Sequence, residues 1–195
     1  MSLAAKVMLA ALAYAPVETR PKYPGYSETR NEAIDRYWSI AVDIAAAAEE
    51  TPTTPGGLSD ESEAALLLAL AIGESGLALD VDRGPCYRKG KLWTRCDSGT
   101  SFSIWQVKPG MVDGKVRTGK ELQTDRKLAA RLALKRARGS LGQCRAMEPH
   151  DRLSAYGAGH CVAGLADIRA RWKLYQRVRD YMRPLDEKRT KEVER

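Results

Sequence analysis

The sequence predicts a mainly helical domain in which several helices surround one buried central helix. Its 195 residues are enough for one domain with a sizeable core. Hydrophobic residues make up 44% of the chain and charged residues 29%, a balance typical of folded rather than disordered proteins. The segment 64–72 is apolar on every helical face, which is typical of a helix enclosed by others.

Residues 1–31 are expected to form a terminal helix and a connector. The apolar run VMLAALA after Lys6 predicts a helix over residues 1–15 that packs on the body of the protein. A signal peptide is the alternative, because AYA resembles a small-residue cleavage site, although Pro16 directly after it obstructs cleavage. The run is too short to span a bilayer, and no other segment of the sequence is suited to do so. Proline and charged residues then predict an irregular connector.

Two helices separated by a turn come next. The first starts near Glu32, where apolar residues recur at the spacing of one helical face: Tyr37, Ile40, Ala41 and Ile44. It stops at TPTTPGG, whose prolines and glycines predict a turn. The central helix follows, with Ser59 or Asp60 as its N-cap and with Glu61 and Glu63 near the positive end of its dipole.

The second half of the chain mixes loops with two further helices. Residues 78–110 are rich in Gly, Asp and Ser and predict loops with a small hairpin. Helix returns over about 120–138, ending near Gly139, and again over about 162–182. The last helix carries a buried stripe made of Leu165, Ile168, Trp172, Tyr175, Val178 and Met182. The chain therefore divides into residues 1–31, a domain over 32–183 and a polar tail over 184–195.

The net charge of +7 and the pI of about 9.3 suggest an anionic partner. Basic residues concentrate over 126–147, which contains no acid: Arg126, Lys127, Arg131, Lys135, Arg136, Arg138 and Arg145. Such a face suits nucleic acid, anionic lipid or a bacterial wall that carries carboxylates and phosphates. The alternative is a solvated helix face that contributes only to solubility.

The four cysteines are disulfide candidates: Cys86, Cys96, Cys144 and Cys161. Three connectivities are open, and the sequential one, 86–96 with 144–161, is favoured because it closes two local loops. The chain has no C-x-x-C motif and only two histidines, so we expect no structural zinc site. Disulfides indicate that the protein functions in an oxidising environment.

Three short stretches hold polar residues in surroundings that suit chemistry. Glu74 in ALAIGESGL ends the apolar helix, where burial and the helix dipole raise the pKa of a carboxyl group. Such an acid can donate a proton to a leaving oxygen, whereas in the alternative it is only the first exposed residue after the helix. Gln106 in DSGTSFSIWQV is either a ligand for a polar substrate group or an exposed amide. Tyr156 in LSAYGAGHC marks either a turn that exposes the phenol or a helix end with a glycine C-cap.

In their order and spacing, these stretches resemble the three signatures of the lysozyme-like lytic transglycosylases and goose-type lysozymes, glycoside hydrolase family 23. AIGESGL, SFSIWQV and LSAYGAGHC stand where the family reads roughly Glu-Ser-Gly, Gly-Leu-Met-Gln and Ala-Tyr-Asn-Ala-Gly. The likeness covers about residues 60–175. It implies a mainly α, α+β lysozyme-like body, with a loop or hairpin region forming one side of a substrate cleft and with no cofactor or metal.

The resemblance implies a role for each matching residue. Glu74 is the catalytic acid/base, and Ser75 lies beside it in the cleft. Asp97 matches an aspartate of the goose-type pattern that is a candidate to position water, whereas in the alternative it only forms a turn before Gly99. Gln106 is expected to bind the sugar backbone, and Tyr156 to hydrogen-bond near the acid.

Three positions depart from the family pattern within the expected substrate site. Ser103 replaces the usual glycine and brings a side chain where the backbone should lie close to sugar. Trp105 replaces the usual methionine and keeps an apolar surface for a sugar ring. Gly157 replaces the asparagine and removes an amide that helps to organise the site.

The implied substrate is peptidoglycan, cut at the β-1,4 bond between N-acetylmuramic acid and N-acetylglucosamine. Without a second carboxylate the N-acetyl group assists and a 1,6-anhydro product leaves. If Asp97, alone or with Asp82, faces Glu74 across about 6.5–9.5 Å, a water fits and hydrolysis follows. Asp97 favours hydrolysis.

Two rival functions predict different behaviour. A wall-binding or structural module would keep the lysozyme-like body with a dead site. A nucleic-acid binder would use residues 126–147, but no aromatic residues interleave the basic ones, so we expect no nucleic-acid partner. We expect a monomer that acts on glycan strands at the bacterial cell wall, whether periplasmic, secreted or phage-delivered.

Overall fold

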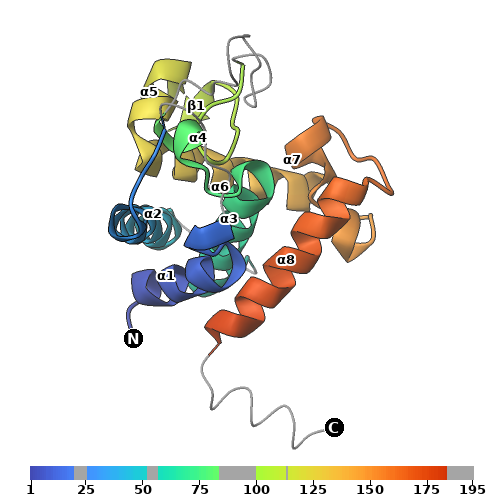
Figure 1. Cartoon of the computed structure of the whole chain (residues 1–195). Coiled ribbons are helices and arrows are strands. Elements are labelled where there is room, and N and C mark those ends of the chain that lie inside the picture. Colours follow the sequence, from blue (N-terminus) through green and yellow to red (C-terminus); the bar gives the residue numbers. More distant parts are fainter. Residues whose placement is uncertain (20–25, 52–56, 84–99, 113, 184–195) are drawn as a thin grey trace, which may run out of the picture.

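The computed structural model describes residues 1–19, 26–51, 57–83, 100–112 and 114–183. The long helices are α1 (Leu3–Tyr14), α2 (Arg30–Glu50), α3 (Asp60–Ser75), α6 (Arg126–Gln143) and α8 (Ala166–Met182). Figure 1 shows α3 in the middle of the molecule, with α1 and α2 on one side and α8 along the other. The expectation of a mainly helical body around one central helix is therefore confirmed.

Helix α3 is central because its side chains leave no polar face for solvent. Residues 64–71 are each at most 1% exposed. Ser59 is the N-cap, since its hydroxyl accepts a hydrogen bond from the backbone N–H of Ser62. Gly76 ends the helix in the left-handed conformation, with φ +60°, which glycine adopts without a steric penalty.

The N-terminal helix shares this core. The side chains of Val7, Ala10 and Ala11 in α1 are buried in the same cluster as those of α2 and α3. A short 3₁₀ turn, η1 (Val17–Thr19), follows α1. Helix α2 begins at Arg30, two residues before the expected start, because Thr29 and Glu32 form a reciprocal capping box.

The expected loops and hairpin of residues 78–110 are described only in part, because residues 84–99 lie outside the described residues. Helix α4 (Leu79–Arg83) occupies the start of this region. The two-stranded antiparallel hairpin comes after it, formed by β1 (Gly110–Val112) and β2 (Lys115–Arg117), with Met111 opposite Val116. A short helix, α5 (Gly119–Thr124), follows the hairpin.

The helix expected over about 120–138 is in fact two helices. Asp125 separates α5 from α6, and its carboxylate accepts a hydrogen bond from the backbone N–H of Leu128 at 2.9 Å as an N-cap. Helix α6 then continues past Gly139 to Gln143. Gly139 does not have a left-handed backbone and lies inside α6, so it does not end the helix.

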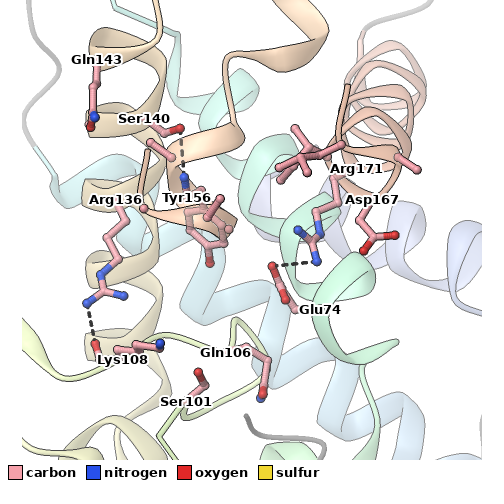
Figure 2. Close-up of a pocket in the computed structure, with 18 residues that line it drawn as sticks. Glu74, Ser101, Gln106, Lys108, Arg136, Ser140, Gln143, Tyr156, Asp167 and Arg171 are labelled. Atoms are coloured by element: carbon pink, nitrogen blue, oxygen red, sulfur yellow. Dashed lines mark hydrogen bonds and ion pairs between the residues drawn. The ribbon is translucent and has the colours of Figure 1, made fainter. Parts of the chain in front are cut away.

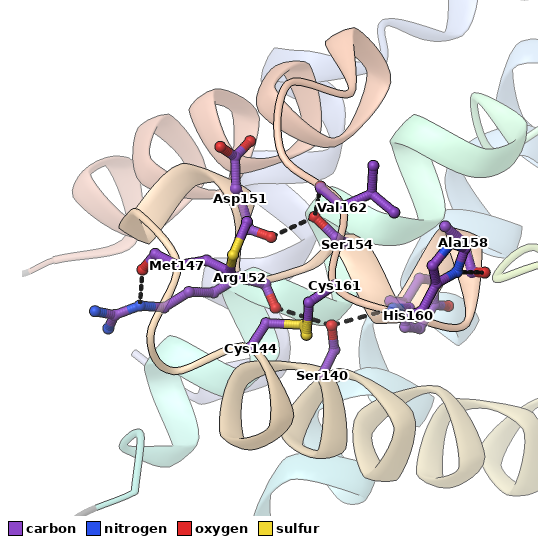
Figure 3. Close-up of a disulfide and its surroundings, with 11 residues drawn as sticks. Ser140, Cys144, Met147, Asp151, Arg152, Ser154, Ala158, His160, Cys161 and Val162 are labelled. Atoms are coloured by element: carbon purple, nitrogen blue, oxygen red, sulfur yellow. Dashed lines mark hydrogen bonds between the residues drawn. A yellow bond between two sulfur atoms is a disulfide. The ribbon is translucent and has the colours of Figure 1, made fainter.

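Beyond α6 the chain forms two short turns before the last helix: η3 (Pro149–Asp151) and α7 (Ser154–Ala158). A disulfide joins Cys144, at the end of α6, to Cys161, with 5.5 Å between the Cα atoms, and so confirms the expected 144–161 pair (Figure 3). The other expected pair, Cys86–Cys96, lies outside the described residues. Ser140 accepts a hydrogen bond from the backbone N–H of Tyr156 at 3.1 Å and thereby ties α6 to α7.

Removing this disulfide is expected to destabilise the fold. Changing both Cys144 and Cys161 to Ser frees a segment of 17 residues and should lower the free energy of unfolding by about 3 kcal/mol. Urea titration followed by circular dichroism measures the change, with Ala146→Ser at an exposed position inside the same segment as the control. A loss below about 0.5 kcal/mol would mean that the remaining packing already fixes this segment.

Within the described ranges, none of the helices combines the length and the apolar character needed to cross a bilayer. The same part of the chain contains no group of three or more His, Cys, Asp or Glu side chains arranged to hold a metal ion.

Candidate active site

The candidate site is a cleft of about 900 Å³ between two pairs of helices. Figure 2 shows α6 and α7 on one side, α3 and α8 on the other, and the loop that carries Ser101 and Gln106 below them. Polar residues from all five segments line it: Glu74, Ser101, Gln106, Lys108, Arg136, Ser140, Gln143, Tyr156, Asp167 and Arg171. One residue from each of the three sequence signatures, Glu74, Gln106 and Tyr156, therefore reaches the same cleft.

Glu74 is held at the C-terminal end of α3, and its side chain is 15% exposed. Burial is the main reason that the pKa of Glu74 lies above its usual value, while the charge of Arg171 lowers it and the charge of Asp167 raises it. Because the raising effects prevail, Glu74 holds its proton to a higher pH than an exposed carboxyl group does. That is the property required of a proton donor.

Arg171 is the charged neighbour of Glu74. Its Nη2 lies 3.3 Å from Oε1 of Glu74, and its side chain is 16% exposed. Two glycines leave room for it. A Cβ on Gly73 would stand 2.8 Å from Cγ of Arg171, and one on Gly157 would stand 3.4 Å from Nη1 of Arg171 and 3.2 Å from Cδ1 of Ile168. A side chain at position 157 would therefore crowd this arginine.

Tyr156 lies on α7, where a helix end with a glycine C-cap is observed in place of an exposing turn. Gly159 caps the helix with φ +78°, and the Tyr156 hydroxyl donates a hydrogen bond to the carbonyl oxygen of Trp105 at 2.9 Å. Burial raises the pKa of Tyr156, the charge of Glu74 adds to this, and Arg136 and Arg171 act against it. The phenol therefore keeps its proton and lies within the electrostatic reach of Glu74.

The loop beneath the cleft turns sharply at two residues with left-handed backbone. Ser103 has φ +62° and Gln106 has φ +48°, a region that glycine occupies more easily. This geometry explains why a glycine would suit position 103, where Ser103 stands with its hydroxyl near the backbone N–H of Trp105. The Gln106 amide donates to the carbonyl oxygen of Ser103 at 2.8 Å, which holds its side chain at the cleft.

Three expected substrate contacts are buried and do not line the cleft. Ser75 is 3% exposed, and its hydroxyl donates to the carbonyl oxygen of Ala71 at 2.8 Å. Trp105 is fully buried, and its indole donates to the carbonyl oxygen of Leu67 at 2.9 Å, so its ring offers no surface to a sugar. Ser103 is likewise buried and does not line the cleft.

The sequence suggested Asp82 and Asp97 as sources of a second carboxylate beside Glu74. Asp82 does not line the cleft, because Arg126 holds both of its oxygens, at 2.8 and 2.9 Å, and Arg36 approaches at 3.5 Å. Asp97 lies outside the described residues. Asp167 lines the cleft beside Glu74 and was not expected from the sequence.

Sequence reasoning missed Asp167, Arg171 and Arg136 as residues of the cleft. Asp167 and Arg171 are four residues apart and so share a face of α8, directly next to the buried stripe that contains Ile168. That spacing was a signal that they flank the packed face. No local signal identified Arg136, because it is one of several basic residues on α6.

Replacing Arg171 with Met is expected to raise the pKa of Glu74 further, since Arg171 is the group that lowers it. A group whose pKa is raised by folding contributes stability below its unfolded value, and that contribution is lost as pH rises through the folded value. The loss of stability with rising pH should therefore be steeper and reach higher pH in Arg171→Met. An NMR titration of the Glu74 carboxyl carbon, with exposed Arg145→Met as the control, measures the shift; a fall in the pKa would contradict it.

Comparisons with protein-family models, with curated proteins and with solved structures each return no match for this chain.

Proposed function

We propose that this protein is a peptidoglycan-degrading glycosidase that cleaves the β-1,4 bond between N-acetylmuramic acid and N-acetylglucosamine, with Glu74 as the general acid/base. One observation carries the proposal: Glu74, Gln106 and Tyr156, which lie far apart in the sequence, line one cleft around a carboxyl group with a raised pKa. A cleft of about 900 Å³ also has the size of a small-ligand site.

Cleavage begins with Glu74 in its protonated form. Glu74 donates its proton to the glycosidic oxygen, the bond from that oxygen to the anomeric carbon breaks, and positive charge develops on the sugar. Glu74 is then a carboxylate, and Arg171 at 3.3 Å stabilises that charge. The same carboxylate is ready to accept a proton in the second half of the reaction.

The reaction can be completed in two alternative ways. In the first, the N-acetyl group of the substrate assists, and the 6-hydroxyl of the same sugar attacks the anomeric carbon and gives its proton to Glu74. A 1,6-anhydro sugar then leaves. In the second, a water that Asp97 positions adds to the anomeric carbon, its proton passes to Asp97, and a reducing sugar forms. Mass spectrometry of the released fragments separates the two, because the anhydro product is lighter by one water.

The test uses purified peptidoglycan, with the wild-type protein and Glu74→Gln side by side. Either product, formed by the wild type and absent with Glu74→Gln, supports the proposal. Equal release by both proteins would contradict the proposal. So would the absence of release by the wild type at every pH between the pKa values of a carboxyl group and a phenol.

A wall-binding module without activity is the second candidate, and the ion pair between Glu74 and Arg171 favours it. An arginine in contact favours the charged carboxylate, which cannot donate a proton. Burial of Trp105, which withdraws a ring from the cleft, points the same way. This candidate predicts that the protein sediments with cell-wall particles while the suspension of particles stays turbid.

A further inference from the structure

Among the described residues, three of the seven basic residues in the segment 126–147 form ion pairs with carboxylates of the protein. Arg126 pairs with Asp82 and with Asp43, Lys127 pairs with Glu50, and Arg138 pairs with Glu63. Lys135 donates to the carbonyl oxygen of Met111 at 3.1 Å. The basic face is therefore open only in part, and one further cation of α6 is held differently from these residues.

Arg136 is that cation, because it points toward the cleft instead of toward a carboxylate (Figure 2). Its Nη2 donates to the carbonyl oxygens of Lys108 and Pro109 at 2.8 and 3.3 Å. No carboxylate in the described part of the chain lies within ion-pair distance of Arg136, and its Nε and Nη1 donors have no acceptor there. A guanidinium in this state has donors to offer an oxyanion.

The surroundings of Arg136 keep it in place and partly out of water. A Cβ on Gly110 would lie 3.2 Å from its Nη2, so the glycine leaves the space that the guanidinium fills. Burial lowers the pKa of Arg136, and Tyr156 acts against this effect. Lys108, whose backbone carbonyl anchors the guanidinium, lines the same part of the cleft. Glu74 and Arg171 lie on the opposite side (Figure 2).

We propose that Arg136, with Lys108 beside it, is a binding site for a carboxylate of the peptide carried by N-acetylmuramic acid. This inference rests on the proposed function and specifies its substrate. In the glycan the sugar rings are neutral, and the lactyl acid of N-acetylmuramic acid is consumed in an amide bond when a peptide is attached. The negative charge next to the cleaved bond therefore belongs to that peptide, and a guanidinium binds a carboxylate through two parallel hydrogen bonds.

The first experiment compares glycan strands whose peptides keep their free carboxylates with the same strands after the peptide carboxyl groups have been converted to amides, so that the lactyl acid stays in its amide bond in both. The quantity measured is the ratio of kcat/KM on the two substrates. Loss of a charged hydrogen-bond donor is expected to lower this ratio about tenfold in Arg136→Gln, with a smaller fall in Arg136→Lys, which keeps the charge. Arg145→Gln, which removes the same charge from an exposed position beyond α6, should leave the ratio at its wild-type value.

The outcomes separate this proposal from the proposed function. If the wild type cleaves and Arg136→Gln lowers both rates in the same proportion, the carboxylate site is wrong and the proposed function stands. A ratio that falls equally in Arg145→Gln also overturns it, because general charge would then be the cause. Thermal unfolding of each variant verifies that the fold is retained, and Arg136→Lys supplies the comparison if Arg136→Gln does not fold.

The second experiment needs no activity. Binding of a soluble muramyl peptide and of a glycerol phosphate oligomer, which stands for wall phosphates, is measured by calorimetry with Glu74→Gln and with Glu74→Gln/Arg136→Gln. The site predicts binding of the muramyl peptide that weakens about tenfold when Arg136 is changed. Binding of the phosphate oligomer alone, or peptide binding that does not depend on Arg136, overturns the proposal. Peptide binding that depends on Arg136 in a protein without activity supports this site while the proposed function fails.

Discussion

Glu74→Gln is expected to lower the rate of peptidoglycan cleavage by about 10²–10⁴-fold, the range that general acid–base catalysis contributes. Glutamine has nearly the same shape as a protonated glutamate, but it cannot give its proton to the glycosidic oxygen. Loss of turbidity of a cell-wall suspension measures the rate. Glu49→Gln, which neutralises an exposed carboxylate on α2, is the control and should clear the suspension at the wild-type rate.

The same substitution is expected to stabilise the fold at neutral and alkaline pH. The pKa of Glu74 is raised by folding, so its contribution to stability is present below the unfolded value and lost as pH rises through the folded value. A neutral side chain at this position removes that loss. Thermal unfolding should therefore give a higher Tm for Glu74→Gln than for the wild type at pH 8, and a smaller difference at pH 4. A variant that is both less active and less stable would point to a structural role.

Arg138→Met is expected to lower the free energy of unfolding by about 3–5 kcal/mol, which is the cost of leaving one member of a buried ion pair alone. Arg138 on α6 donates from Nε and Nη2 to the two carboxylate oxygens of Glu63 on α3, each at 2.6 Å. Glu63 is 1% exposed, so water does not replace the arginine when it is removed. The pair joins the helix that carries Glu74 to the helix that carries Arg136.

Urea titration measures this effect, and a double variant tests its cause. Glu63→Leu/Arg138→Met removes both charges and should recover most of the lost stability, because no buried charge is then left without a partner. Arg145→Met serves as the control for loss of an exposed arginine. A loss in Arg138→Met below about 1 kcal/mol would mean that the pair behaves as an exposed one.

The sequence determined the features that depend on neighbours along the chain. The central helix followed from an apolar run with Ser59 or Asp60 as its N-cap, and the structure has Ser59 in that position. The 144–161 disulfide followed from favouring closure of a local loop. Glu74, Gln106 and Tyr156 were found as three signatures in order, and all three line the cleft.

Only the tertiary structure decided which charges meet. Arg171 pairs with Glu74 although the two residues are nearly a hundred positions apart in the sequence. Asp82, which the sequence suggested as a second carboxylate of the site, forms an ion pair with Arg126 instead. Arg136 and Arg138 are two residues apart on one helix, yet they face the cleft and Glu63 respectively. Local spacing fixes the face of a helix on which a residue lies, whereas the packing of distant helices fixes what that face meets. An arginine's role is therefore set by its partner, which the surrounding sequence does not contain.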